Sequence, residues 1–176
     1  GLFSSVTDHR YASGVVAYRV AAEPWADGAI TRRAVALPGA STIRTKGQWS
    51  FPTGSVLLKT ISLELTPGDA ASRRRIETQL LHFDGQGWRG YGYRWNDNQS
   101  DAELVDAAGV DVPFEVRDSS AGGGQRRQTH HFAARVECVR CHNKWSGDAL
   151  AFNTAGLDVP DARDPAAANQ LDQLSG

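Results

Sequence analysis

The stretch that decides the fold is Ser55-Val-Leu-Leu-Lys-Thr-Ile-Ser-Leu-Glu-Leu65, because its second half alternates strictly between apolar and polar residues. Alternation with a period of two is typical of a β-strand that buries one face. The apolar face carries Leu57, Ile61, Leu63 and Leu65. Lys59 lies on the same face, so its ammonium either reaches solvent at the strand end or points into a pocket.

Shorter runs of the same kind lie on both sides of this stretch, and turn sequences rich in glycine and proline separate them. The strands we expect are 15–20, 31–37, 42–45, 55–65, 74–83, 88–95 and 112–116, and residues 102–105 form a brief helix or strand. Residues 1–30 are otherwise irregular. The pattern predicts a mainly β fold, an antiparallel sheet with its β core over residues 31–117.

The only two cysteines of the chain lie in Glu137-Cys138-Val139-Arg140-Cys141-His142, a C-x-x-C-H run near the C-terminus. Two thiols at this spacing can add to the two vinyl groups of one haem, and the histidine that follows is placed to bind the iron. We therefore interpret the chain as the housing of one covalent haem c, with His142 as the proximal iron ligand.

The sequence around the motif predicts how it is presented. Residues 132–142 have helical propensity and no breaker, which predicts a haem-attachment helix with both sulfurs on one side. Residues 118–131 read as a loop, and residues 143–176 as a loop and tail with a last helix at 166–174. Gly90 and Gly92 share one face of their strand, which indicates close approach by a porphyrin, an aromatic side chain or a helix.

Other chemistries use two cysteines at this spacing. A thioredoxin-type dithiol lies at a helix start within a βαβ pattern, and no such pattern is visible here. A zinc site needs two further ligands, which His130 and His131 could provide. A zinc site, a structural disulfide and a chance match therefore stay open beside haem attachment.

The second iron ligand is restricted by composition, because the chain has no methionine. The sixth ligand is then another histidine, a lysine, water or nothing. His131 is the candidate distal ligand because it directly precedes the predicted helix; its alternative is a hydrogen bond to a propionate or to the backbone. We interpret His9 and His82 as surface or strand-face residues. The candidate propionate partners, each otherwise a solvated charge, are Arg74, Arg75, Arg126 and Arg127.

Length and charge limit the function class. The chain has 176 residues, which we read as a single domain over 1–176, and 19 basic against 20 acidic residues. This balance argues against nucleic-acid binding, and no apolar run is long enough for membrane insertion. The chain begins at Gly1 and shows no signal peptide, which suggests a domain excised from a larger protein. Because covalent haem is attached outside the cytoplasm, we expect a periplasmic or otherwise exported location.

Two resemblances add to this reading. The first is carried by Gly1-Leu-Phe3, Trp25-Ala-Asp-Gly-Ala29, Trp49-Ser-Phe-Pro-Thr-Gly54, Arg74-Arg-Ile-Glu-Thr78, Tyr91-Gly-Tyr-Arg-Trp-Asn96, Asp101-Ala-Glu-Leu-Val105 and the C-x-x-C-H run. Over nearly its whole length the chain resembles an uncharacterised family of bacterial exported proteins. In these the haem-motif domain is joined to other redox modules, and a histidine stands at the position of His131. The resemblance implies an electron-transfer module with a redox partner protein or adjoining redox domain.

The second resemblance is more distant. Gly54-Ser-Val-Leu-Leu-Lys59, the β core and the C-terminal C-x-x-C-H resemble cytochrome P-460 and the beta-type cytochromes c-prime. This implies a mainly antiparallel β fold with the haem-bearing helix packed on the sheet. It also implies that Lys59 lies beside the haem edge, where cytochrome P-460 joins a lysine covalently to haem and oxidises hydroxylamine. The region before the cysteines departs from this pattern.

Three functional hypotheses follow. In the one we favour, histidines bind both sides of the iron and the domain relays electrons. In the second, the iron is five-coordinate and binds or oxidises a small molecule such as nitric oxide, hydroxylamine or peroxide. Lys59, desolvated in an apolar pocket, would then be a nucleophile or base and the catalytic residue. In the third, the haem is mainly structural.

Overall fold

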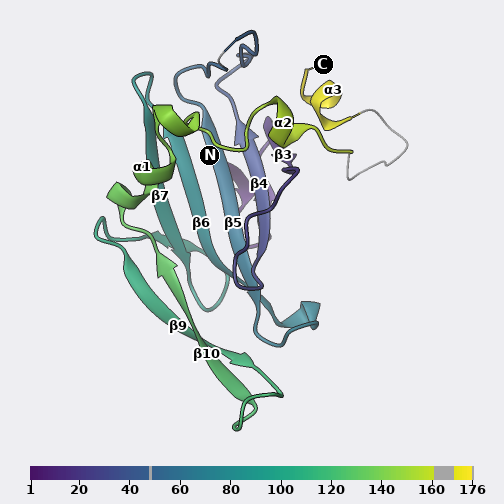
Figure 1. Ribbon diagram of the computed structural model, residues 1–176, viewed down its shortest axis with the longest axis vertical. Helices are drawn as coiled ribbons and strands as arrows, with labels where there is room; N and C mark the ends of the chain where they lie inside the picture. The colour runs from purple at the N-terminus through teal and green to yellow at the C-terminus, as the bar shows by residue number, and fades with distance from the viewer. Residues whose placement is uncertain (48, 161–168, 176) are drawn as a thin grey trace.

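A six-stranded antiparallel sheet forms the centre of the molecule, with strand order β3-β4-β5-β6-β7-β8 (Figure 1). It is seen in a computed structural model that describes residues 1–47, 49–160 and 169–175. The strands are β3 (Val15–Tyr18), β4 (Ile30–Ala36), β5 (Val56–Glu64), β6 (Arg73–Phe83), β7 (Trp88–Trp95) and β8 (Ala102–Leu104). Each strand pairs with the next one along the chain, so the sheet is a simple meander, as the turn sequences between the strands indicate.

Two small antiparallel pairs and a few short helices complete the described structure. The strand pairs are β1 (Phe3–Ser5) with β2 (Arg10–Tyr11), and β9 (Val110–Arg117) with β10 (Gln125–Phe132). The helices are α1 (Arg135–Cys141), α2 (Thr154–Leu157), α3 (Gln170–Ser175) and the 3₁₀ turns Ala70–Ser72 and Lys144–Ser146. The predicted mainly β, antiparallel architecture with few helices is confirmed. None of the helices described has the length and apolarity needed to cross a bilayer.

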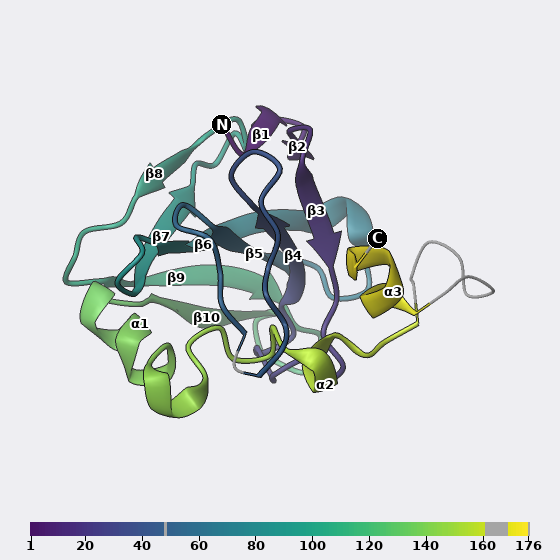
Figure 2. The same cartoon turned by 90° about the horizontal axis from the view of Figure 1, so that it is seen from above.

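Both faces of the central sheet are covered. Seen from above, β1 and β2 lie on one side of it, and α1 and α2 lie on the other (Figure 2). In β5, at the middle of the sheet, Leu57 and Leu58 are both buried although they point to opposite faces. The expectation of one apolar and one solvated face is wrong here, since Thr60 on the supposedly solvated face is only 2% exposed.

Two apolar clusters hold the layers together. The first fastens the segment after α1 to one face of the sheet and contains Val35, Leu57, Trp88, Ala149, Phe152 and Leu157. The second fastens the β9–β10 hairpin to the sheet and contains Leu63, Ile76, Val105, Val116 and Phe132. In sequence, α1 lies between Phe132 of the second cluster and Ala149 of the first. Burial of these flanking residues limits where α1 can lie on the sheet.

Several predicted boundaries are corrected. The loop expected at 118–131 ends early, because residues 125–132 pair with β9 over eight positions as β10. The helix therefore begins at Arg135 instead of at residue 132, and Phe132 is the fully buried end of the strand. Residues 102–104 resolve as a strand.

Other differences lie near the ends of the chain. Residues 1–30 hold three short strands, while 42–45 contribute only an isolated bridge from Arg44 to Ser50. Two short helices interrupt the tail expected after residue 143. The last predicted helix, 166–174, is seen from Gln170 onward as α3, and residues 166–168 lie outside the described part of the chain.

Candidate functional site

A cleft of about 320 Å³ lies between the central sheet and the segment that contains α1. The candidate site residues Lys59, Cys138, Cys141 and His142 line it together, as do Gly90 and Gly92. Strand pairing explains the sheet side, because residues paired across antiparallel strands share a face. Lys59 pairs with Gln79, and Gln79 pairs with Gly92, so one row across three strands faces the cleft.

The two glycines of β7 are explained by close approach from different groups. A Cβ on Gly90 would lie 2.5 Å from the Cβ of Cys138 and 2.7 Å from its Sγ. A Cβ on Gly92 would lie 2.7 Å from Oε1 of Glu77. Of the three approaching groups considered for these glycines, the helix is therefore the one that Gly90 accommodates, and α1 rests directly on β7.

Both cysteines are free thiols. Cys138 is half-buried and its Sγ lies 3.8 Å from the carbonyl oxygen of Ala134, whereas Cys141 is exposed. Burial raises the pKa of the Cys138 thiol, and the nearby carboxyl group of Glu77 raises it further. The Cys138 thiol is thus protonated at neutral pH, and the two cysteines have not formed the structural disulfide that the sequence left open.

His142 is held in one tautomer by the backbone. Its Nδ1 lies 2.7 Å from the carbonyl oxygen of Asp148, and a carbonyl only accepts, so Nδ1 carries the proton. Nε2 is then left with a free lone pair, the arrangement usual in metal-binding histidines. Burial lowers the pKa of His142, the bond to Asp148 opposes this, and the charge of Lys59 lowers the pKa further. The ring is therefore the neutral imidazole that metals bind.

Lys59 faces the cleft. Burial lowers the pKa of its ammonium, and the positive charge of Arg33, its cross-strand neighbour on β4, lowers it further. Arg33 itself is engaged by the carboxylate of Glu23. Within the described residues no hydrogen bond or ion pair to the Lys59 ammonium is found. Of the two interpretations of this lysine, the pocket is the one that agrees with its position.

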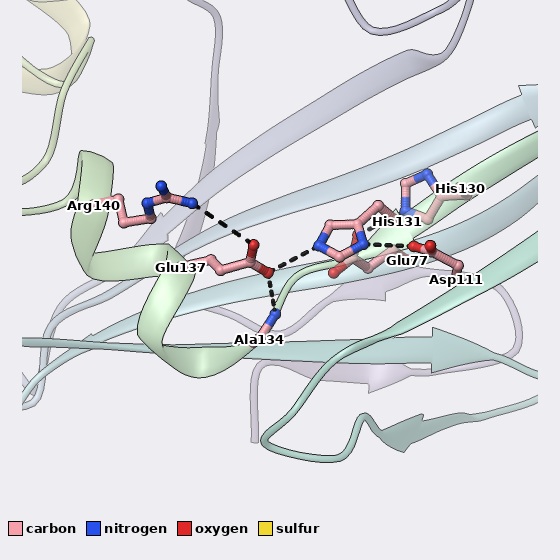
Figure 3. A network of polar contacts seen from close by, with 7 residues as sticks. All are labelled: Glu77, Asp111, His130, His131, Ala134, Glu137 and Arg140. Carbon is pink, nitrogen blue, oxygen red and sulfur yellow. Dashed lines mark hydrogen bonds and ion pairs between the residues drawn. The ribbon is translucent and has the colours of Figure 1, made fainter.

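His131 does not lie on the cleft. Its side chain is 55% exposed, with Nδ1 2.6 Å from Oδ1 of Asp111 and Nε2 2.8 Å from Oε2 of Glu137 (Figure 3). These two hydrogen bonds raise the pKa of His131. The interpretation of His131 as the distal ligand is therefore not supported, because strand alternation turns it outward and turns His130 inward.

His130 reaches a carboxyl group that the sequence analysis missed. Its Nε2 lies 2.8 Å from Oε2 of Glu77, whose residue is only 1% exposed and lines the cleft (Figure 3). Among the described residues no group of three or more His, Cys, Asp or Glu side chains is placed to hold a metal ion. The zinc alternative, which needed His130 and His131 beside the cysteines, has no support in this arrangement.

The remaining candidates lie elsewhere. His9 is on the opposite face of the sheet, where its Nε2 lies 2.9 Å from Oγ1 of Thr60, and His82 is a half-buried strand residue. The predicted propionate partners are absent from the cleft lining, and Arg33 is present there instead. Three of them have other partners: Arg74 donates to the Asp97 carbonyl, Arg75 stacks on Trp95, and Arg126 pairs with Asp118.

A scan against protein-family models, a search of curated proteins and a search of solved structures each gave no match. The site is therefore interpreted from its own donor set. Cys138 and Cys141 are free, close to each other on one short helix, and both reach a largely apolar cleft. His142 offers a lone pair to the same space. These residues fit one haem, which the two sulfurs would anchor covalently and whose iron His142 would bind.

Proposed function

We propose that this chain is a c-type haem domain in which Cys138 and Cys141 carry one covalent haem and His142 binds its iron. The observation that carries the proposal is the position of His142. Its Nδ1 is held by the Asp148 carbonyl, while its ring lines the same cleft as both thiols. Attachment is redox-neutral: each S–H adds across one vinyl double bond, with sulfur bonding to one carbon and hydrogen to the other.

We propose further that the iron keeps an open sixth position. The chain has no methionine, and among the described residues His142 is the only histidine that lines the cleft. The haem, when bound, supplies one-electron redox chemistry and a site for a small ligand such as nitric oxide, hydroxylamine or peroxide. His142 fixes the iron from one side. Lys59, with its lowered pKa, can donate a hydrogen bond to a bound ligand or act as a base. This is the arrangement expected from the resemblance to cytochrome P-460.

The alternative is the electron relay in a larger exported redox protein, which the first resemblance implies. Its supporting observation is that α1 lies at the surface, with Val136 72% exposed and Cys141 also exposed. A haem attached there would lie close to a partner protein or an adjoining redox domain. Because His131 faces away from the cleft, a six-coordinate relay would need Lys59 as its second ligand.

Visible spectroscopy tests these proposals. The protein is expressed with a haem-attachment system in the periplasm, and its spectrum is recorded oxidised, reduced, and reduced with carbon monoxide. We expect covalent haem, a high-spin spectrum and a shift on adding carbon monoxide. A low-spin spectrum indifferent to the gas would favour the relay, and Lys59→Leu, which cannot bind iron, would then open the sixth position. Absence of covalent haem in the wild type would overturn the proposal, and Cys138→Ser with Cys141→Ser is the matched negative control.

A further inference from the structure

We infer that Glu77 and His130 form a proton path between the cleft and solvent, so that reduction of the site is accompanied by uptake of one proton at Glu77. This inference rests on the proposed haem function and deepens it, since it assigns a proton-exchanging acid to the same cleft. Neither residue is used by the haem attachment proposed above.

Glu77 is placed as an acid that serves the cleft. It comes from β6, is only 1% exposed and lines the cleft. Its Oε2 accepts hydrogen bonds from Nε2 of His130 at 2.8 Å and from Nε2 of Gln79 at 3.1 Å. Within the described residues no hydrogen bond is found to its other oxygen, Oε1, which lies against Gly92. The missing side chain of Gly92 leaves room for this carboxyl group, since a Cβ there would lie 2.7 Å from Oε1.

His130 connects this acid to water. Its side chain is 24% exposed, whereas that of Glu77 is 1% exposed, so the pair spans the boundary between interior and solvent. The ring is held edge-on against Phe132, with centroids 4.7 Å apart. His130 comes from β10, which belongs to the separate β9–β10 sheet, so the path joins two residues 53 positions apart in the chain. An imidazole can take a proton at one nitrogen and release one at the other, which suits it to relay protons.

Charged and titratable groups surround Glu77 on several elements. Lys59 of β5, Arg94 of β7, His130 of β10 and Cys138 of α1 face it from the four neighbouring elements. A buried carboxylate loses most of its solvation and depends on these neighbours for its charge. When one electron enters the cleft from a one-electron donor protein, the positive charge that favours the carboxylate falls by one.

The step that follows balances in charge and atoms. His130 takes up a proton from solvent at Nδ1 while its Nε2 gives a proton to Oε2 of Glu77, so the carboxylate becomes a carboxylic acid and the imidazole stays neutral. One electron and one proton have then entered, and no other bond forms or breaks. Lys59 takes no part in this step, so the step adds to the role proposed for Lys59 in the cleft without replacing it.

Redox titration of the holoprotein tests the path. The midpoint potential is measured against pH, and proton uptake on reduction is followed with an indicator dye in weakly buffered solution. We expect one proton taken up per electron in the wild type and none in Glu77→Gln. In His130→Gln we expect the same stoichiometry with uptake slowed about a hundredfold, the low end of what a positioned proton-transfer group contributes. His82→Gln, on the same strand as Glu77 but away from the cleft, is the control and should behave as the wild type.

The outcomes separate this inference from the haem function. A Glu77→Gln protein with a normal haem spectrum and unchanged proton uptake would overturn the path and leave the haem domain intact. A wild-type protein that takes up no proton on reduction would overturn it equally. If Glu77→Gln does not fold, the uptake rate of His130→Gln decides, and wild-type speed in that variant rejects the relay. Absence of haem in the wild type would remove both proposals.

Discussion

Gly90 of β7 lies directly beneath Cys138 of α1, so closely that a single methyl group on the glycine would meet both the Cβ and the Sγ of the cysteine. The residue that anchors one side of the proposed haem is therefore positioned by the absence of a side chain on the sheet. Glu77 stands in the same relation to Gly92, two residues along the same strand. The glycine faces of β7 thus set the depth at which both the helix and the buried acid lie.

We predict that Gly90→Ala destabilises the domain by about 1–3 kcal/mol, the range typical of overpacking a closely packed contact. Its Cβ would force α1 outward and move Cys138, so covalent haem content should fall as well. Urea unfolding and the absorbance of the attached haem measure these two effects. Gly122→Ala is the matched control, because nothing lies within 4 Å of its Cβ position. Equal stability of Gly90→Ala and the wild type would show that α1 does not rest on this strand.

His9 gives a pH-dependent prediction on the other face of the sheet. Its pKa is lowered to about 4, mainly by burial and then by Arg75 and Arg32, so the folded protein holds it neutral. The unfolded chain binds a proton near pH 6.5, which means that stability is lost as the pH falls from about 6.5 to about 4.

We expect His9→Asn to remove that part of the pH dependence, because asparagine tolerates the left-handed backbone of residue 9, with φ of 50°. Urea unfolding at pH 7 and pH 4.5 tests this, with His82→Gln as the control histidine. If wild type and His9→Asn lose the same stability over this interval, His9 is not the titrating group.

His131 should show the opposite sign. Its pKa is raised by hydrogen bonds to Asp111 and Glu137, so its contribution is complete below pH 6.5 and is lost as the pH rises through the raised value. Because the side chain is well exposed, we expect His131→Gln to cost less than about 1 kcal/mol. The cost should be larger at pH 6 than at pH 9, and the haem spectrum should not change. A changed spin state in His131→Gln would restore it as an iron ligand.

The strands of the central sheet could be predicted because the signals that mark them, side-chain alternation and turn residues, lie within a few residues of each strand. Alternation in 55–65 and the turns around it place β5, β6 and β7 within two residues of their observed ends. The opposite face of β5 could not be predicted, because Thr60 is covered by His9 from 51 residues away. Nothing in the periodicity of a strand records which distant segment packs on it.

The hairpin strand β10 was missed for a related reason. Residues 125–131 are polar, and a polar run without alternation reads as a loop. In the structure its inward positions are filled by polar residues with distant partners: Gln128 donates to the Asp27 carbonyl, and His130 bonds to Glu77. The cysteine motif could be recognised from its spacing alone. The outward orientation of His131 could not, because it follows from side-chain alternation along β10, a strand that the sequence did not predict.

Lys59 gives the most direct test of the cleft in the absence of haem. It stands opposite Arg33 across two paired strands, and like charges in this position destabilise a sheet. We expect Lys59→Met, which keeps the length of the side chain without its charge, to stabilise the haem-free domain by about 0.2–1 kcal/mol.

The effect of Lys59→Met should also depend on pH. Because the pKa of Lys59 is lowered in the folded protein, the unfolded chain binds more protons than the folded one as the pH approaches 10.5, so wild-type stability rises with pH in that interval. The advantage of Lys59→Met should therefore shrink between pH 7 and pH 10. Lys46→Met, at an exposed position outside the cleft lining, is the control. A Lys59→Met domain less stable than the wild type at pH 7 would mean that the ammonium has a stabilising partner in the cleft. Lys59 would then not be free to contact a small ligand bound to the haem, and that role would be rejected.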